Sequence, residues 1–378
     1  MKHYLDNAAT TQTCPDAAAA ALAAMTENYA NPSSTHTMGR EAARELAACR
    51  NAAAEALGTK KPEEVVFTSG GSESDTWALL SGAEAMKRKG RHILSSLAEH
   101  DAVRRSLDAL ESRGFEVTRL RPDAVGRISP EQVRSALRED TVLVSLMMVN
   151  NETGAVTDIR AVSDAMKEAG SCALLHTDAV QAFRKIPFRA DCLGADLISV
   201  SGHKIHAVKG IGALWIRSGL RLNPLILGGS QENGRRAGTE PMPQIAAFAA
   251  ACRQDPQTDR IRSMKVLAIR RLTEEVPELR FLDTEAPHIL SVSMPGWRSE
   301  VLMTFLESRE IYVSRSSACK QGKRSHVLEA LGLKSEIIDG ALRIGLSRYT
   351  TEEDIEALAE GLRDARALAH RSPGSRTR

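Results

Sequence analysis

The chain has 378 residues, more than one small core requires, and this length suits a large α/β domain with a smaller one beside it. Hydrophobic residues make up 42% of the sequence and the formal net charge is +2, so the composition points to neither a nucleic-acid partner nor a membrane partner. No apolar run reaches the roughly 20 residues of a membrane-spanning helix, and Asp6 comes too early for a signal peptide, so we expect a cytoplasmic protein.

Over the first 230 residues, short runs rich in strand-forming residues alternate with amphipathic stretches. The runs predict strands at 65–68, 92–96, 116–120, 141–148, 173–176, 197–201 and 213–216, and the stretches between them predict helices at 72–89, 101–113, 130–138 and 159–168. This alternation predicts βαβ units and a largely parallel sheet. Several strands are apolar throughout, which is typical of a sheet covered on both faces.

A second α/β pattern follows a polar stretch at 255–257. It predicts, in order, a helix at 259–275, a strand at 289–293, a helix at 299–307, a polar loop at 314–325, a strand near 342–346 and a terminal helix at 352–368. We expect a large domain over residues 13–253 and a small domain formed by 1–12 with 254–378. The tail 371–378 is rich in Pro, Gly, Ser and Arg, a composition typical of disorder.

Polar and ionisable residues follow the predicted strands directly. Ligands of parallel α/β sheets bind beyond the carboxyl ends of the strands, so these residues are candidates for an active site. They lie at 69–72, 99–100, 150–152, 178–181 and 201–204.

Two of these turns carry recognisable chemistry. Gly70, Gly71 and Ser72 open a helix, where glycine lets the backbone approach a phosphate and free N–H groups face it; the alternative is an ordinary capped turn. Lys204 ends another strand, and a lysine amine joined to an aldehyde cofactor forms an imine that a substrate amine can displace. Asp178 lies 26 residues earlier and could keep a pyridine nitrogen protonated, or merely cap a helix.

The order of several motifs resembles the cysteine desulfurases, NifS-like enzymes of the class-V aminotransferase fold. The motifs are LDNAATT at 5–11, NPSSTH at 31–36, FTSGGSESD at 67–75, VNNETG at 149–154, HTDAVQ at 176–181, SGHK at 201–204 and RRAGT at 235–239. The resemblance runs from residue 4 to about 360. It implies the type-I pyridoxal-phosphate transferase fold, a pyridoxal 5'-phosphate cofactor, L-cysteine as the substrate and a homodimer.

The resemblance also implies a role for each matching residue. Lys204 would hold the cofactor, His100 would stack on its ring and help to move protons, and Asp178 would pair with the ring nitrogen. Further cofactor contacts are implied for Gly71, Ser72, Asn151, Gln181, Ser201, His203 and, from a second subunit, Thr239. The substrate carboxylate would be bound by Asn151 and Arg343, and a guanidinium fork suits a carboxylate physically.

The presence of Cys319 distinguishes a desulfurase from enzymes that catalyse other reactions on this fold. It lies in the polar loop at 314–325, where Arg315, Lys320, Lys323 and Arg324 favour its thiolate form. The family's nucleophile lies in a similar loop, so the resemblance implies that Cys319 carries sulfur as a persulfide to an acceptor protein of iron–sulfur cluster assembly or thiolation. The other five cysteines are read as small buried hydrophobes, and the absence of C-x-x-C pairs predicts no metal site.

Two alternatives remain open. One is a selenocysteine lyase, or another lyase or transaminase, on the same scaffold, which would turn over cysteine without Cys319. The other is a non-enzymatic assembly or regulatory protein with a degenerate form of the fold, which would be colourless when purified.

Overall fold

The computed structural model describes residues 2–282, 284–315 and 324–371. Its largest element is a seven-stranded sheet with the order β2-β8-β7-β6-β5-β3-β4. These strands span Val65–Thr68 (β2), His92–Ser96 (β3), Glu116–Leu120 (β4), Thr141–Ser145 (β5), Leu174–Asp178 (β6), Leu197–Ser201 (β7) and Gly212–Ile216 (β8). β8 runs antiparallel to both of its neighbours and the other pairs are parallel, so the expected largely parallel sheet is confirmed.

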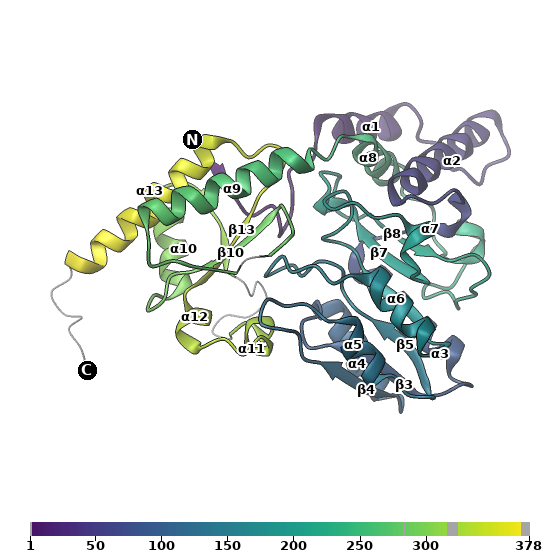
Figure 1. Ribbon diagram of the computed structural model, residues 1–378. Coiled ribbons are helices and arrows are strands. Elements are labelled where there is room, and N and C mark those ends of the chain that lie inside the picture. The colour runs from purple at the N-terminus through teal and green to yellow at the C-terminus, as the bar shows by residue number, and fades with distance from the viewer. Residues whose placement is uncertain (1, 283, 316–323, 372–378) are drawn as a thin grey trace.

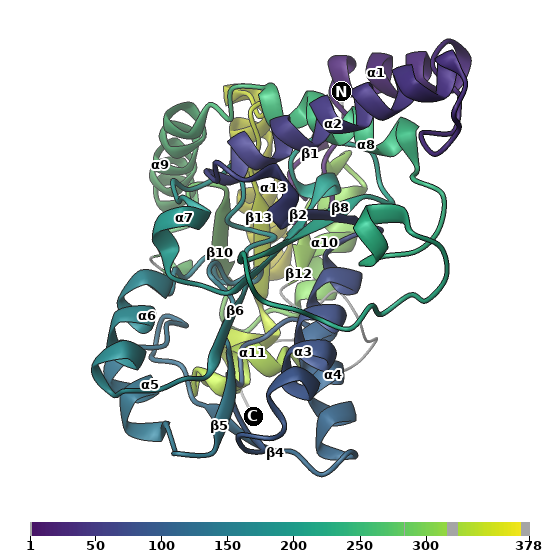
Figure 2. The ribbon, with the colours of Figure 1, turned by 90° about the vertical axis from the view of Figure 1, so that its right-hand side faces the viewer.

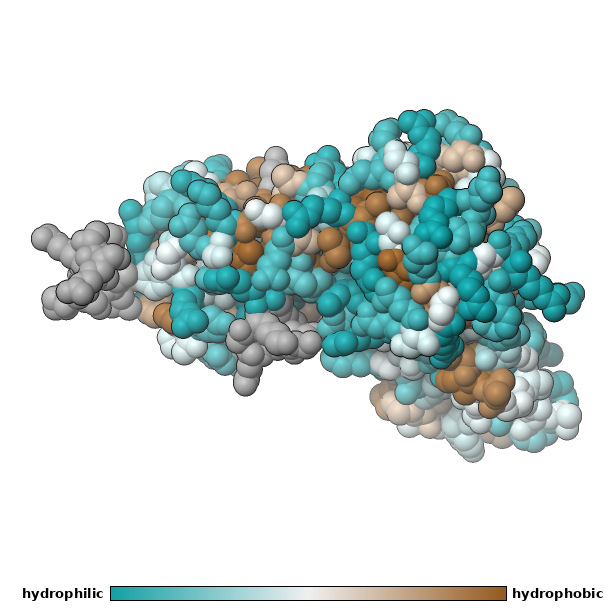
Figure 3. Space-filling model, turned by 90° about the horizontal axis from the view of Figure 1, so that it is seen from below, coloured by the Kyte–Doolittle hydropathy of each residue, from teal (hydrophilic) through white to brown (hydrophobic). Residues whose placement is uncertain are grey.

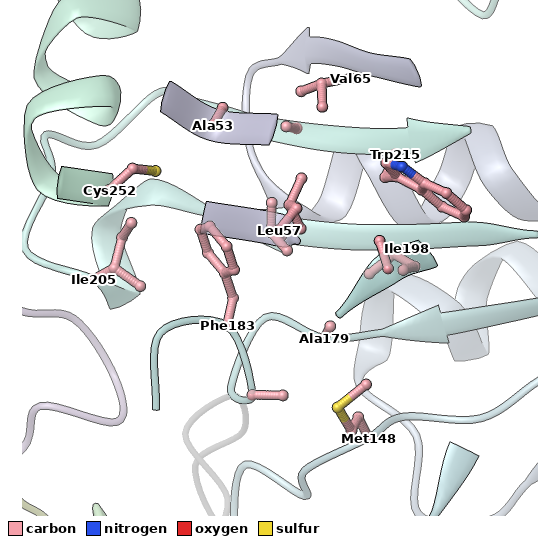
Figure 4. Packing of buried hydrophobic residues seen from close by; sticks show 14 of the residues in the cluster. Ala53, Leu57, Val65, Met148, Ala179, Phe183, Ile198, Ile205, Trp215 and Cys252 are labelled. Atoms are coloured by element: carbon pink, nitrogen blue, oxygen red, sulfur yellow. The ribbon is translucent and has the colours of Figure 1, made fainter. Parts of the chain in front are cut away.

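Helices cover both faces of this sheet (Figures 1 and 2). They span Pro15–Thr26 (α1), Thr37–Leu57 (α2), Gly71–Met86 (α3), Asp101–Glu111 (α4), Pro130–Ala136 (α5), Ile159–Glu168 (α6), Ala190–Leu193 (α7) and Met242–Arg253 (α8). Neighbouring strand residues point to opposite faces and so enter different cores. On β7, for example, Leu197 belongs to the buried cluster that contains Trp77 of α3, whereas Ile198 belongs to the separate cluster shown in part in Figure 4.

A second group of elements is built mainly from the C-terminal third of the chain. Its four-stranded sheet has the order β12-β13-β10-β9, and β1 pairs with β11 beside it. The strands span His3–Tyr4 (β1), Arg280–Leu282 (β9), Ile289–Ser293 (β10), Ile311–Tyr312 (β11), Ser314–Arg315 (β12) and Ala341–Gly345 (β13), and the helices span Thr258–Glu275 (α9), Ser299–Glu307 (α10), His326–Ala330 (α11), Ser335–Asp339 (α12) and Glu352–Arg371 (α13). The proposed domain boundaries at 12/13 and 253/254 stay a prediction.

Three local predictions need correction. β6 extends to Asp178, so this residue ends the strand and does not follow it. β5 ends at Ser145, and two residues later the Met147 N–H donates to the Glu99 carboxylate at 3.2 Å, although the Leu146 and Met148 N–H groups still donate to carbonyl oxygens of β6. The predicted polar loop begins with the short strand β12.

The surface seen in Figure 3 is mainly hydrophilic, with a few hydrophobic clusters. Two of the cysteines expected to be buried, Cys172 and Cys192, are exposed, whereas Cys14, Cys49 and Cys252 are buried as expected. Among the described residues, no helix is both long enough and apolar enough to cross a bilayer.

Candidate active site

A cavity of about 360 Å³ lies at the edge of the large sheet where the parallel strands end. All predicted site residues line it, with two exceptions: Thr239, which lies elsewhere, and Cys319, which falls outside the described residues. The second group of elements contributes Arg343 from β13 and His326 from α11, and the N-terminal segment contributes Ala8 and Ala9. The cavity is therefore built by parts of the chain that are far apart in sequence.

Lys204 stands on a short turn directly after β7. Its Nζ donates hydrogen bonds to the carbonyl oxygens of Ala8 at 2.7 Å and Ala9 at 2.6 Å. Burial, helped by the positive charge of Arg343, lowers the pKa of the Lys204 amine to about 8, although Asp6 and Asp178 act in the opposite direction. A sizeable share of this amine is therefore neutral, and able to attack an aldehyde, near neutral pH.

Asp178 is a buried carboxyl at the end of β6. Its Oδ1 accepts a hydrogen bond from the Val180 N–H at 2.9 Å. Burial raises the pKa of Asp178 to about 7, and the nearby carboxyl of Asp75 adds to this rise. A cation placed against Asp178 would stabilise its charged form, which is what a protonated pyridine nitrogen provides.

The turn from β2 into α3 forms a cradle beside Asp178. Gly70 has φ of +153°, a conformation that favours glycine, and a Cβ atom on Gly71 would lie 2.7 Å from Val180 Cγ2, so a larger residue there would require Val180 to shift. The first turn of α3 presents its backbone N–H groups here, an arrangement that suits a phosphate. Ser201 and His203 line the same cavity from β7 and the turn after it. Burial, with the charge of Lys204, lowers the pKa of His203 to about 4, so its ring is neutral.

Arg343 carries the positive charge on the other side of the site. It is 2% exposed, and its two terminal nitrogens donate to the Asn151 carbonyl oxygen at 3.0 Å and to Asp6 Oδ1 at 3.1 Å. The contact with Asn151 thus uses that residue's backbone. A buried guanidinium facing a cavity can bind a carboxylate, as the sequence predicts, and Asp6 is its counter-ion here.

His100 caps α4 from the cavity side. Its Nδ1 accepts the Ala102 N–H at 3.1 Å, which leaves Nε2 for a ligand. Gln181 is oriented by two contacts: its amide nitrogen donates to the Ala8 carbonyl oxygen at 2.9 Å, and its oxygen lies 3.1 Å from His288 Nε2. His288 was not anticipated, because nothing local in the sequence connects it with Gln181.

Nine further residues line the cavity without having been assigned a role from the sequence. Five of them are ionisable: Asp75, Glu99, Asp101, Glu152 and His326. Burial raises the pKa of Asp75 to about 7, that of Glu99 to about 8 and that of Glu152 to about 7. Asp75 follows Ser72 by three residues, and this spacing places both on one face of a helix. The sequence therefore contained a signal that Asp75 faces the same site as Ser72.

Thr239 stands apart from this arrangement, and Cys319 lies outside the described residues. Thr239 is exposed and borders a separate hollow of about 210 Å³ with Ser69 and Arg236. Of the four cations that flank Cys319 in the sequence, Arg315 pairs with Glu300 at 2.9 Å and Arg324 with Asp339 at 2.7 Å.

Pyridoxal phosphate fits the cavity chemically. The volume lies in the range of small-molecule sites. The lysine amine, the buried acid and the glycine cradle supply partners for the aldehyde, the ring nitrogen and the phosphate, respectively. Among the described residues no cluster of His, Cys, Asp and Glu could hold a metal ion.

The comparisons with known proteins agree with this chemistry. The class-V aminotransferase model matches residues 3–358. Cysteine desulfurase IscS of Methanosarcina thermophila is 39% identical over 94% of this chain and 90% of its own. Among solved structures, a NifS-like protein has a TM-score of 0.91 and 33% identity, covering 97% of this chain and 100% of its own. SspA in complex with cysteine has a TM-score of 0.80 and 33% identity, covering 93% of this chain and 100% of its own.

The site and the comparisons lead to one assignment: the chain belongs to the class-V aminotransferase family and, within it, to the pyridoxal-phosphate-dependent cysteine desulfurases of the NifS-like type.

Proposed function

We propose that this enzyme converts L-cysteine to L-alanine and keeps the sulfur as a persulfide on Cys319. The observation that supports this most is the meeting of the Lys204 amine, the Asp178 carboxyl and the buried Arg343 guanidinium around one cavity. The reaction is balanced: cysteine and the enzyme thiol give alanine and an enzyme persulfide. The carbon–sulfur bond of the substrate breaks, a sulfur–sulfur bond forms, and the thiol proton stays with the products.

Each side chain has a defined task in this proposal. Arg343 binds the substrate carboxylate, and Lys204 removes and returns a proton at the substrate α-carbon. Asp178 would hold the ring nitrogen of the cofactor in its protonated form, and His100 would cover the ring and help to move protons. When bound, pyridoxal phosphate supplies the electron sink for the charge that develops at the α-carbon. The lowered pKa of the Lys204 amine supports its role as a base near neutral pH.

The length of the chain supports Cys319 as the sulfur acceptor. It follows Arg315, the last residue of β12, by four positions, and an extended chain covers at most about 14 Å over that distance. Ser314 of β12 pairs directly with Arg343, which lines the cavity. A thiol on this tether can therefore approach a sulfur atom held in the cavity.

We further propose a homodimer that delivers sulfur to an acceptor protein in the cytoplasm, for iron–sulfur cluster assembly or thiolation. Thr239, which lies outside the cavity of its own chain, would reach the cofactor phosphate in the partner subunit. Large exposed hydrophobic side chains support a subunit interface; Leu227 is 82% exposed and Tyr29 is 67% exposed.

The test is Cys319→Ser, with Cys192→Ser as a matched control because Cys192 is an exposed cysteine that does not line the cavity. The Cys319 variant should still change the cofactor absorbance when cysteine is added, but should release almost no sulfide. Mass spectrometry of the wild type, treated with cysteine without reductant, should find one added sulfur on the peptide that contains Cys319. Full alanine and sulfide production by Cys319→Ser would instead indicate a lyase without a thiol nucleophile.

A further inference from the structure

The start of α11 is tied to the wall of the active site. Ser325, which precedes this helix, donates a short hydrogen bond from its hydroxyl to Glu152 Oε2. The same Ser325 oxygen accepts the Leu328 N–H at 3.1 Å and so caps the helix. Glu152 belongs to the turn that also carries Asn151, so one hydroxyl connects this turn to α11.

Two further contacts hold α11 in the same place. His326 Nε2 lies 3.1 Å from the carbonyl oxygen of Glu99, so the ring donates its proton there. Val327 and Leu331 pack against Ala98 in a small buried cluster. These contacts reach the turn after β3, which leads into His100. The two turns that carry Asn151 and His100 are therefore both joined to α11.

The hydrogen bond between Glu152 and Ser325 joins two buried polar side chains. Glu152 is 5% exposed and Ser325 is 4% exposed. Burial is also the main cause of the raised pKa of Glu152, and the Ser325 hydroxyl acts against it by stabilising the carboxylate. A buried carboxylate that lost this donor would have to be protonated or hydrated, so the pair holds together strongly.

We propose that Glu152 and Ser325 are positioning residues for sulfur transfer: their hydrogen bond fixes the downstream end of the segment that carries Cys319 at the rim of the cavity. Ser325 follows Cys319 by six residues, a reach of at most about 21 Å. With Ser325 held against Glu152, this reach sets an upper limit on the distance between the thiol and the rim of the cavity. This inference rests on the proposed role of Cys319, and it predicts a defect in sulfur transfer without a defect in cysteine binding.

The test is a double-mutant cycle with Ser325→Ala, Glu152→Met and the double variant in the full-length holoenzyme. Cysteine affinity is read from the cofactor absorbance, and the rate of persulfide formation on Cys319 is read by quenched-flow mass spectrometry. Each single variant should slow persulfide formation about tenfold, the effect of one hydrogen bond to a charged group, with cysteine affinity within about twofold of wild type. The double variant should be no slower than the singles, because both remove the same bond.

Ser129→Ala is the matched control, because Ser129 caps α5 in the same way but lies outside the cavity. It should leave both readouts unchanged. The proposal is overturned if either single variant transfers sulfur at the wild-type rate, if the two effects multiply in the double variant, or if cysteine affinity falls in parallel with transfer. A wild type that accumulates no persulfide on Cys319 would be a failure of the proposed function itself.

Discussion

The lowered pKa of Lys204 predicts how fast the apoprotein takes up its cofactor at different pH values. Only the neutral amine attacks an aldehyde. With a pKa of about 8, roughly 9% of the Lys204 amine is neutral at pH 7. An ordinary lysine with a pKa of about 10.4–10.5 has roughly 0.03% neutral amine at pH 7. The structure therefore predicts a fraction of reactive amine about 300-fold larger for Lys204.

The assay is the rate at which pyridoxal phosphate recombines with the apoprotein, followed by absorbance from about pH 6 to pH 10. The rate should rise with pH, reach half of its maximum near pH 8 and be flat above about pH 9. Two charge variants should move the midpoint in opposite directions. Asp6→Asn removes a charge that raises the pKa of Lys204 and should lower the midpoint, whereas Arg343→Gln removes a charge that lowers this pKa and should raise it.

Stability is a necessary control, because Asp6 and Arg343 form a partly buried ion pair. Both variants should therefore be compared at temperatures at which circular dichroism shows them folded. A rate that climbs without a plateau to pH 10 would refute the reasoning, and so would a shift of both midpoints in the same direction.

Three further changes test other parts of the structure. Asp178→Asn should still bind pyridoxal phosphate, as seen by absorbance, but lose most of its turnover because an amide cannot hold the pyridinium proton; a wild-type rate would reduce Asp178 to a structural role. Arg343→Lys should raise KM for cysteine about tenfold or more with a smaller change in kcat, since an ammonium lacks the bidentate fork, and an unchanged KM would place the carboxylate elsewhere. Glu232→Ala should lower the free energy of unfolding in urea by about 3 kcal/mol, because it leaves Arg50 without its buried bidentate partner at 2.6 and 2.7 Å; a loss below about 1 kcal/mol would contradict that account.

The local elements of this fold were determined by the sequence itself. The runs at 65–68, 92–96 and 197–201 are strands with the predicted bounds, and every residue in them is buried, as expected of a sheet covered on both faces. The same pattern predicted the convergence of the site. Parallel strands end at one edge, so the motifs that follow them meet there, and 10 of the 12 predicted site residues line one cavity.

Tertiary structure alone decided the contacts that join distant parts of the chain. Asp6 meets Arg343 across 337 positions and His288 meets Gln181 across 107, and no periodicity in the sequence encodes such pairs. The pKa of Lys204 could not be predicted from the sequence either, because it depends on burial and on charges brought together from separate elements. Residue type and spacing set which groups can do the chemistry, whereas packing sets the solvation and the partners that give each group its charge state.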